Sequence, residues 1–235
     1  MNILVTGATR GIGKEIAETF KKLGYSVFAS GRNEELLKCY QNYCVCDLAT
    51  NNGIELLGEY IQKNDIDILI NNAGEYLYTP VLDGFDIEKI EHITKLNLEA
   101  PLYLISKAVQ HMKNNKFGRI VNIGSISGVM GEASACLYSA AKAGLIGATR
   151  ALALELAEYG ITVNTINPGW VDTDLGNSSV NESEFSKEEV IDCIPQRRFI
   201  SPSEIAGMVK YLVSEDAKGV TGQSINLCAG LSVGY

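Results

Sequence analysis

The chain has 235 residues, of which 46% are hydrophobic and 20% charged, and its formal net charge is −8. This length and composition suit one soluble domain with a full core, so we expect residues 1–235 to form a single domain. The acidic balance argues against a nucleic-acid partner, whose phosphates require clustered Lys and Arg. No apolar stretch is long enough to span a membrane and no signal peptide is apparent, so we expect a cytoplasmic protein without a membrane partner.

The first segment of the chain predicts a strand over residues 2–6, a glycine-rich turn and a helix. The turn reads TGATRGIG and contains Gly7, Gly11 and Gly13. Such a turn lets the backbone approach a diphosphate, while the helix N-terminus presents unpaired N–H groups and the positive end of its dipole. We therefore predict a dinucleotide site, although glycines at this wider spacing also occur in simple tight turns.

Further strands are predicted near residues 26–30, 43–47, 66–70, 118–124, 161–166 and 224–228, with helical segments between them. This alternation predicts an α/β protein with a single doubly wound parallel sheet, the Rossmann fold, of about seven strands with helices on both faces. Ligands of such sheets bind beyond the carboxyl ends of the strands. Several polar and glycine-rich motifs fall at those ends.

The end of the second strand, VFASGRNEE, lacks the acidic residue that NAD enzymes commonly use to bind the ribose hydroxyls. Gly31 stands there instead, Arg32 follows it, and Arg10 lies in the glycine-rich turn. Two guanidinium groups can make charge-assisted contacts with a 2′-phosphate. We therefore predict NADP(H) as the cofactor. The alternative is that Arg32 caps a solvated helix beside Glu34 and Glu35 while Arg10 faces water.

Tyr138 and Lys142 lie four residues apart in a segment whose apolar spacing predicts a helix. Their side chains then emerge on the same face, one turn apart. A nearby ammonium stabilises a phenolate, so we expect Lys142 to lower the pKa of Tyr138. The pair is a candidate proton-transfer device, although an amphipathic helix with one Tyr and one Lys on its rim gives the same pattern.

Six short motifs follow one another along the chain. They are TGATRGIG at the N-terminus, NNAG at 71–74, Asn97, Ser125 thirteen residues before Tyr138, the pair of Tyr138 and Lys142, and NPG at 167–169. In this order and spacing they resemble the short-chain dehydrogenase/reductases, over essentially the whole chain. The nearest subgroup resembles the bacterial beta-ketoacyl-acyl-carrier-protein reductases. The resemblance implies an oxidoreductase that transfers a hydride between NADP(H) and a ketone or secondary alcohol.

The resemblance also implies roles for four catalytic side chains. Tyr138 would exchange a proton with the substrate oxygen, and Ser125 would hydrogen-bond to that oxygen. Lys142 would bind the nicotinamide ribose, and Asn97 would hold a water that supplies protons to the lysine. Ser127, the second serine of GSISG, would be a loop residue or a supporting group.

The cofactor-binding residues follow from the same resemblance and from the arginines described above. Asp47 would hydrogen-bond to the adenine, and Thr173 would bind the nicotinamide carboxamide. The predicted set is Gly7, Thr9, Arg10, Gly11, Ile12, Gly13, Arg32, Asp47, Asn72, Ala73, Gly74, Tyr138, Lys142, Pro168, Gly169 and Thr173. The six cysteines and two histidines show no metal-ligand spacing, so we predict no metal, no disulfide and free buried thiols.

The segment at about 175–200 is expected to form a lid over the cleft. It is polar and serine-rich, and it becomes briefly helical from about Ser186 to Cys193. Residues that could line a moderately apolar pocket beside it, or simply pack, are Tyr76, Tyr78, Val129, Met130 and Trp170.

An acyl carrier protein is one candidate partner, beside a free small carbonyl or alcohol substrate. A carrier protein is acidic, so its reductase usually presents basic residues near the entrance. Tyr159 occupies one of the two positions where the resemblance predicts a base, Lys116 occupies the other, and Arg197 and Arg198 lie at the end of the lid. The docking surface is therefore incomplete. Apolar faces on 90–112 and 138–158, together with the habit of the family, predict a homodimer or homotetramer.

Three functions are compatible with the sequence. The first is an NADPH-dependent reductase of a 3-oxoacyl thioester or a similar ketone. The second is a dehydrogenase or reductase of a free small alcohol or ketone, such as a sugar, nucleotide-sugar or steroid. The third is a non-catalytic dinucleotide-binding protein, which the retention of Tyr138 and Lys142 argues against.

Overall fold

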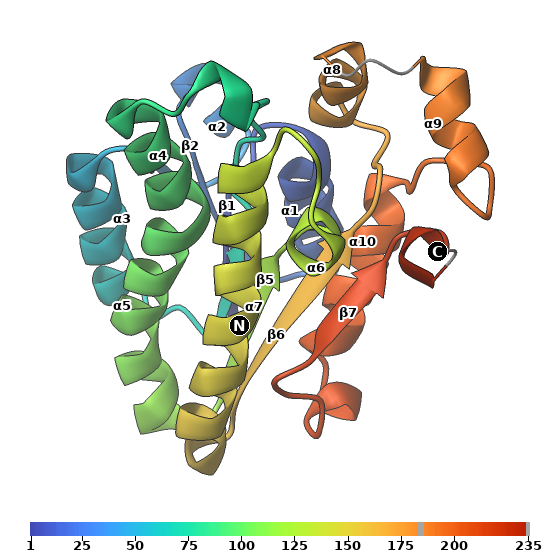
Figure 1. Cartoon of the computed structure of the whole chain (residues 1–235). Coiled ribbons are helices and arrows are strands. Elements are labelled where there is room, and N and C mark those ends of the chain that lie inside the picture. The colour runs from blue at the N-terminus through green and yellow to red at the C-terminus, as the bar shows by residue number, and fades with distance from the viewer. Residues whose placement is uncertain (183–185, 234–235) are drawn as a thin grey trace.

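A parallel sheet of seven strands forms the centre of the molecule in the computed structural model, which describes residues 1–182 and 186–233 (Figure 1). The strands are β1 (Asn2–Thr6), β2 (Ser26–Gly31), β3 (Asn42–Val45), β4 (Ile68–Asn71), β5 (Gly118–Ile123), β6 (Ile161–Pro168) and β7 (Ser224–Leu227). Their order is β3-β2-β1-β4-β5-β6-β7, and every neighbouring pair is parallel. The predicted doubly wound fold is confirmed.

Helices cover both faces of the sheet. They are α1 (Gly11–Lys22), α2 (Glu34–Leu37), α3 (Asn51–Lys63), α4 (Ile87–Thr94), α5 (Ala100–Asn115), α6 (Ser127–Met130), α7 (Cys136–Leu156), α8 (Asp174–Glu182), α9 (Lys187–Cys193) and α10 (Pro202–Leu212). Ile3 and Val5 of β1 share one core cluster with residues of α1 and α10. Leu4, between them, joins a second cluster with residues of α3, α5 and α7. This alternation follows from the two-residue period of a strand, and it leaves the strand ends free for the site.

The predicted helix around residues 90–112 is interrupted, which corrects the sequence-based expectation. A π-helical turn over Lys95–Glu99 separates α4 from α5, and Asn97 lies within it. Single π turns inside longer helices are frequent at functional sites because they redirect a side chain. Here the turn buries Asn97 completely.

Two helices, rather than one, occupy the predicted lid segment. The predicted helix near Ser186 to Cys193 is confirmed as α9, which Ser186 caps in a capping box with Glu189. The preceding stretch, expected to be irregular, forms α8. Its first turn carries Asp174, and the hydroxyl of Thr173 accepts a hydrogen bond from the Gly176 amide. Both features stabilise a helix N-terminus. Residues 183–185 of the predicted lid lie outside the described residues.

The cysteines only partly follow the expectation of free buried thiols. Three are buried and three are exposed: Cys44, Cys46 and Cys228 belong to the first group, and Cys39, Cys136 and Cys193 to the second. No cluster of three or more potential metal ligands occurs within the described residues. Across that same part of the chain, none of the helices combines the length and apolarity needed to cross a membrane.

Candidate active site

A cavity of about 1000 Å³ opens where the strands end, between the loops that follow β1, β2, β3, β4, β5 and β6. Of the predicted site residues, all but Gly13 and Asn97 line this cavity. Gly13 and Asn97 lie behind the residues that line the cavity. The site residues, which are spread from residue 7 to residue 173, are therefore brought together at one edge of the sheet, as the doubly wound fold predicts.

The glycine-rich turn after β1 has a backbone that only small residues permit. Gly7 and Gly11 adopt positive φ angles of 67° and 53°. A Cβ atom on Gly13 would lie 2.3 Å from the Gly7 carbonyl oxygen, so the first turn of α1 packs directly on the loop. No side chain caps the N-terminus of α1, and its first turn holds no acidic residue. This geometry leaves backbone N–H groups available to an anion such as a diphosphate.

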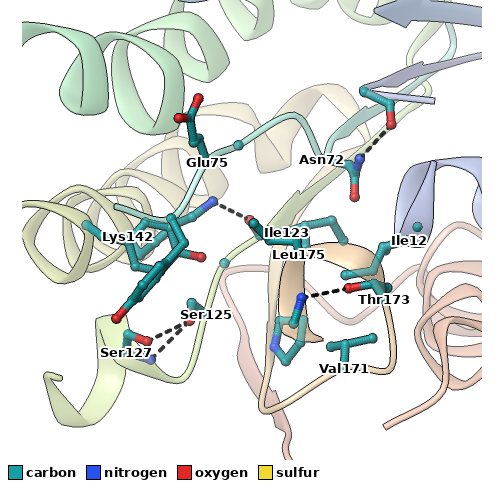
Figure 2. Close-up of a pocket in the computed structure, with 18 of the residues that line it drawn as sticks. Ile12, Asn72, Glu75, Ile123, Ser125, Ser127, Lys142, Val171, Thr173 and Leu175 are labelled. Carbon is teal, nitrogen blue, oxygen red and sulfur yellow. Dashed lines mark hydrogen bonds between the residues drawn. The ribbon is translucent and has the colours of Figure 1, made fainter. Parts of the chain in front are cut away.

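The loop after β4 is tied to the glycine-rich turn. The Asn72 side-chain amide donates to the backbone oxygens of Thr6, at 2.8 Å, and Gly7, at 3.3 Å (Figure 2). The Thr6 hydroxyl accepts from the backbone amides of Asn72 and Ala73, at 2.9 Å each. These hydrogen bonds fix the loop after β4 relative to the glycine-rich turn on one side of the cavity, and Asn72 connects the two.

Two exposed arginines stand at the β2 side of the cavity. Arg10 and Arg32 both line it, and no carboxylate among the described residues lies within ion-pair distance of either guanidinium. Asn33, and not Arg32, caps α2 by accepting a hydrogen bond from the Leu36 amide at 3.3 Å. The alternative in which Arg32 caps the helix is therefore wrong, and both guanidinium groups are available to a ligand.

Gly31 and Asp47 also line the β2 side of the cavity. A Cβ atom on Gly31 would approach the Thr9 side chain to 2.9 Å, so a larger residue would crowd the cavity wall. Asp47 follows β3 and accepts a hydrogen bond from the Ala49 amide at 3.0 Å, while it still lines the cavity. The predicted 2′-phosphate and adenine contacts thus lie within one region.

Lys142 is buried beneath the centre of the cavity, with only 4% of its surface exposed. Its ammonium donates to the Ile123 carbonyl oxygen at 3.0 Å and lies 5.5 Å from the centre of the Tyr138 ring (Figure 2). Burial lowers the pKa of this lysine to about 8 because the charged form is poorly solvated. The ammonium is therefore still the main form at neutral pH.

The pKa of Tyr138 moves in the direction opposite to the one predicted. Burial raises it to about 12, the hydrogen bond with Ser125 opposes this rise, and the negative charge of Glu132 adds to it. Our expectation that this pKa lies below its ordinary value is wrong for this structure, because desolvation of the phenolate is the largest influence on it. The phenol therefore keeps its proton across the neutral range.

A chain of hydrogen bonds extends from Ser125 towards the substrate side of the cavity. The Ser125 hydroxyl donates to the Ser127 hydroxyl at 3.0 Å and accepts from the Ser127 backbone amide at 3.1 Å (Figure 2). The Ser127 hydroxyl in turn donates to Glu132 at 2.5 Å. The Tyr76 hydroxyl donates to the other oxygen of Glu132 at 3.0 Å. Ser127 is thus a supporting group, as predicted, but nothing in the sequence marked Glu132.

The Tyr76 ring also packs edge-on against Tyr138, with ring centres 5.4 Å apart. Tyr76 comes from the loop after β4 and Glu132 from the loop before α7, so the contact joins two segments that are distant in sequence. The Tyr138 ring therefore contacts the loop after β4 through Tyr76.

Asn97 supports the floor of the site from behind the cavity wall. Its side-chain amide donates to the backbone oxygens of Glu75, at 3.0 Å, and Ile93, at 3.1 Å. A Cβ atom on Gly74 would lie 2.8 Å from the Asn97 side-chain oxygen and 3.3 Å from the Lys142 nitrogen. Gly74 therefore lets the loop pass close to both groups, which lie together as the sequence predicts.

The end of β6 forms the remaining side of the cavity. The Pro168 carbonyl oxygen accepts from the Ile126 amide at 2.9 Å, and the Gly169 amide donates to the Leu227 carbonyl oxygen at 3.0 Å, so this turn is anchored to the loop after β5 and to the end of β7. A Cβ atom on Gly11 would lie 3.3 Å from the Thr173 methyl group. Thr173 thus approaches the glycine-rich turn across the cavity.

Comparison with known proteins agrees with this geometry. The family model described as enoyl-(acyl carrier protein) reductase matches residues 7–232. The chain belongs to the short-chain dehydrogenase/reductase family. This short-chain dehydrogenase/reductase is 37% identical to the 3-oxoacyl-(acyl-carrier-protein) reductase FabG of Rickettsia felis, over 97% of this chain and 95% of the relative. The resemblance predicted from the motifs is confirmed, and the protein is an oxidoreductase.

Solved structures give the same result. A variant of the actinorhodin polyketide ketoreductase with NADPH superposes with a TM-score of 0.91 at 35% identity, over 99% of this chain and 97% of the other. A gluconate 5-dehydrogenase from Beutenbergia cavernae, described as putative and with bound NADP, gives a TM-score of 0.89 at 30% identity, over 98% and 96% of the two chains. Each of these similar structures was solved with NADP or NADPH.

The substrate side of this short-chain dehydrogenase/reductase mixes aromatic and acidic side chains. Of the five predicted lining residues, Tyr76, Tyr78, Met130 and Trp170 line the cavity and Val129 does not. Sequence reasoning missed the carboxylates that join them, which are Glu75, Glu132, Asp174 and Glu189. Acidic residues in loops ordinarily face water, so no sequence signal distinguishes these four.

Proposed function

We propose that this chain is an NADPH-dependent reductase that transfers a hydride to a ketone and forms a secondary alcohol. One observation carries the proposal: the Tyr138 phenol, the Ser125 hydroxyl and the Lys142 ammonium meet in the same cavity whose other end holds Arg10 and Arg32. Ketone reduction needs a proton donor beside the carbonyl and a nicotinamide nucleotide within reach. The chain's own residues supply the proton donor and the groups that would bind the nucleotide in this cavity.

The residues at the β1 and β2 side fit a phosphorylated dinucleotide. The uncapped N-terminus of α1 and the glycine-rich turn suit the diphosphate, while the unpaired guanidinium groups of Arg10 and Arg32 suit a 2′-phosphate. Lys142 and Thr173 would hold the nicotinamide half. When bound, the nicotinamide supplies the hydride.

The chain's own residues supply the proton. With a pKa of about 12, Tyr138 is protonated at neutral pH and can donate to the carbonyl oxygen as negative charge develops there. Ser125 would hydrogen-bond to that oxygen and stabilise the same charge. The Lys142 ammonium would stabilise the phenolate that remains, and Asn97, which lies beside it across Gly74, would hold a water that returns the proton.

A 3-oxoacyl thioester is the first candidate substrate. It is supported by the name of the Rickettsia relative, a 3-oxoacyl-(acyl-carrier-protein) reductase, and by the similarity to a polyketide ketoreductase. A cavity of about 1000 Å³ is large enough for the nicotinamide and such a chain together.

A free small ketone is the second candidate, and the charges at the entrance favour it. Of the predicted docking cations, Arg198 forms a bidentate pair with Glu204 at 2.7 and 2.8 Å, and Arg197 pairs with Asp192 at 3.0 Å. These intramolecular pairs leave Lys116 as the predicted cation without an ion pair within the described residues. An acidic carrier protein therefore gains little attraction here.

The test compares kcat/KM for acetoacetyl-carrier protein, acetoacetyl-coenzyme A and free ketones, each with NADPH and with NADH. Reduction of acetoacetyl-coenzyme A with a preference for NADPH is the expected result. A carrier-protein substrate that is no better than the coenzyme A thioester would agree with the paired arginines. If none of these ketones is reduced, the proposed function is wrong.

We also propose that the chain works as a single domain with a lid at about 175–200, in the cytoplasm, as a homodimer or homotetramer. Leu154, on α7, is 85% exposed, which agrees with pairing of this helix with a second copy. Sedimentation at micromolar concentration tests the assembly, and a purely monomeric species would contradict it.

A further inference from the structure

The lining of the cavity contains both cationic and acidic side chains. Arg10 and Arg32 stand at the nucleotide end together with Asp47, and Lys142 is the one other Lys or Arg among the described lining residues. Four further carboxylates line the cavity, those of Glu75, Glu132, Asp174 and Glu189. A charged ligand group beside one of them is screened less by water than at an open surface, because the space is partly enclosed.

Glu132 is the carboxylate of this set that hydrogen bonds connect to Ser125. It is half-buried, and it is separated from Ser125 by a single intervening hydroxyl, that of Ser127. Its second oxygen accepts from Tyr76, whose ring packs against Tyr138. Two partners, one at the start of α6 and one in the loop after β4, thus fix the carboxylate beside the groups that would bind the carbonyl oxygen.

Glu132 retains capacity to bind a substrate donor. An ionised carboxylate offers about four acceptor positions, and the hydrogen bonds from Ser127 and Tyr76 occupy two of them. A hydroxyl, amide or ammonium group of the substrate can use the others. A substrate carboxylate cannot, because it has no proton to donate and carries the same charge.

We propose that Glu132 is a specificity-determining residue, which favours ketones with a hydrogen-bond donor one or two carbons from the carbonyl and rejects ketones with a carboxylate there. The inference rests on the proposed function, since that function places the carbonyl oxygen at Ser125 and Tyr138. Neutral 3-oxoacyl thioesters are compatible with it. Like charges held a few ångströms apart in a partly enclosed site differ from a neutral pair by about 10- to 100-fold in binding.

The test uses acetoacetamide and acetoacetate, which differ mainly in the charge of the group two carbons from the ketone. In the unmodified enzyme with NADPH, kcat/KM for the amide is expected to exceed that for the carboxylate by about 10- to 100-fold. Glu132→Gln keeps the side-chain shape and removes the charge, so the ratio should fall to about 3-fold or less. Glu188→Gln removes an exposed carboxylate that does not line the cavity and should leave the ratio near its original value.

A binding measurement separates this inference from the proposed function. Trp170 is the single tryptophan and lines the cavity, so quenching of its fluorescence by the non-reducible pair isobutyramide and isobutyrate reports binding without turnover. If no ketone is reduced, the proposed function fails, and this pair still tests Glu132. An amide-to-carboxylate ratio that is the same in Glu132→Gln and the unmodified protein, or that falls equally in Glu188→Gln, would overturn the inference.

Discussion

The nucleotide end and the substrate end of the cavity are built in different ways. At the nucleotide end, Gly7, Gly11 and Gly13 shape a backbone surface, and a Cβ atom on Gly13 would lie only 2.3 Å from the Gly7 carbonyl oxygen. At the substrate end, the wall consists of side chains such as Tyr76 and Glu132, which hydrogen-bond across two loops. The first end would recognise what dinucleotides share, and we expect the preference of the second to change with single substitutions.

This difference separates binding of the cofactor from chemistry on the substrate. The groups that would hold the adenosine half come from the loops after β1, β2 and β3, whereas Ser125 and Tyr138 belong to the segment between β5 and β6. We therefore expect substitutions at one end to leave the other end largely unaffected, because mutations at sites with no shared contacts have nearly additive effects on free energy.

The largest effect is expected from Tyr138→Phe, which changes the substrate end alone. Loss of the proton donor should reduce kcat by about 10²- to 10⁴-fold, while the dissociation constant for NADPH stays within about 2-fold. Steady-state kinetics and fluorescence titration with NADPH measure the two quantities. Tyr78→Phe, which removes a hydroxyl from the same cavity, is the matched control and should retain most activity.

A smaller effect is expected from Arg32→Asp, which changes the nucleotide end alone. Replacing a charge-assisted contact by a repulsive carboxylate should weaken NADPH binding by about 10- to 100-fold and leave NADH binding nearly unchanged. Isothermal titration with both nucleotides measures this. Arg150→Asp, an exposed charge reversal on α7 that does not line the cavity, controls for the change in net charge. Equal weakening by both substitutions would show that Arg32 does not contact the 2′-phosphate.

The smallest expected effect concerns protein stability and the buried lysine between the two ends. The pKa of Lys142 is about 8 in the folded protein against 10.5 in an exposed lysine, so between these values the unfolded chain binds more protons. The free energy of unfolding should therefore rise with pH in this window, by about 1–2 kcal/mol between pH 7.5 and 9.5.

Urea denaturation at the two pH values measures this contribution. The rise should be smaller in Lys142→Met than in the unmodified protein, and Lys63→Met, which removes an exposed lysine, should retain it. The opposite effect from Tyr138 begins only above about pH 10, because its pKa is raised rather than lowered. A rise of the same size in Lys142→Met would mean that another group causes it.

The two ends also differ in how far the sequence predicts them. The glycines of the nucleotide end can be predicted from the sequence, because the backbone there requires them and the strand-helix alternation fixes where the loops meet. Asp47 and Thr173 are assigned by the family resemblance alone. The pair of Tyr138 and Lys142 was predicted for a similar reason, since helical spacing places them on one face. The raised pKa of Tyr138 was not predicted, because it depends on how deeply the fold buries the phenol.

The substrate end was predicted only in part. Tyr76 and Ser127 were candidates, but Glu132 lies in a loop with no local pattern to distinguish it from a solvated acid, and its hydrogen bonds to both are apparent only in the folded arrangement. The π turn that buries Asn97 was likewise absent from the prediction, because a one-residue change in helix period leaves little trace in apolar spacing. Side-chain contacts between loops depend on tertiary structure in a way that strand and helix periodicity do not.

The most direct test of the central claim, that one cavity joins a NADPH site to a ketone-reducing proton donor, is the transfer of label from deuterated nicotinamide. The enzyme would be incubated with acetoacetyl-coenzyme A and NADPH carrying deuterium at the reactive nicotinamide carbon, and the product analysed by mass spectrometry and NMR. The account predicts deuterium on the carbinol carbon with the unmodified enzyme, and loss of this product in Tyr138→Phe despite bound NADPH. Labelled alcohol formed equally well by Tyr138→Phe, or alcohol without deuterium, would contradict it.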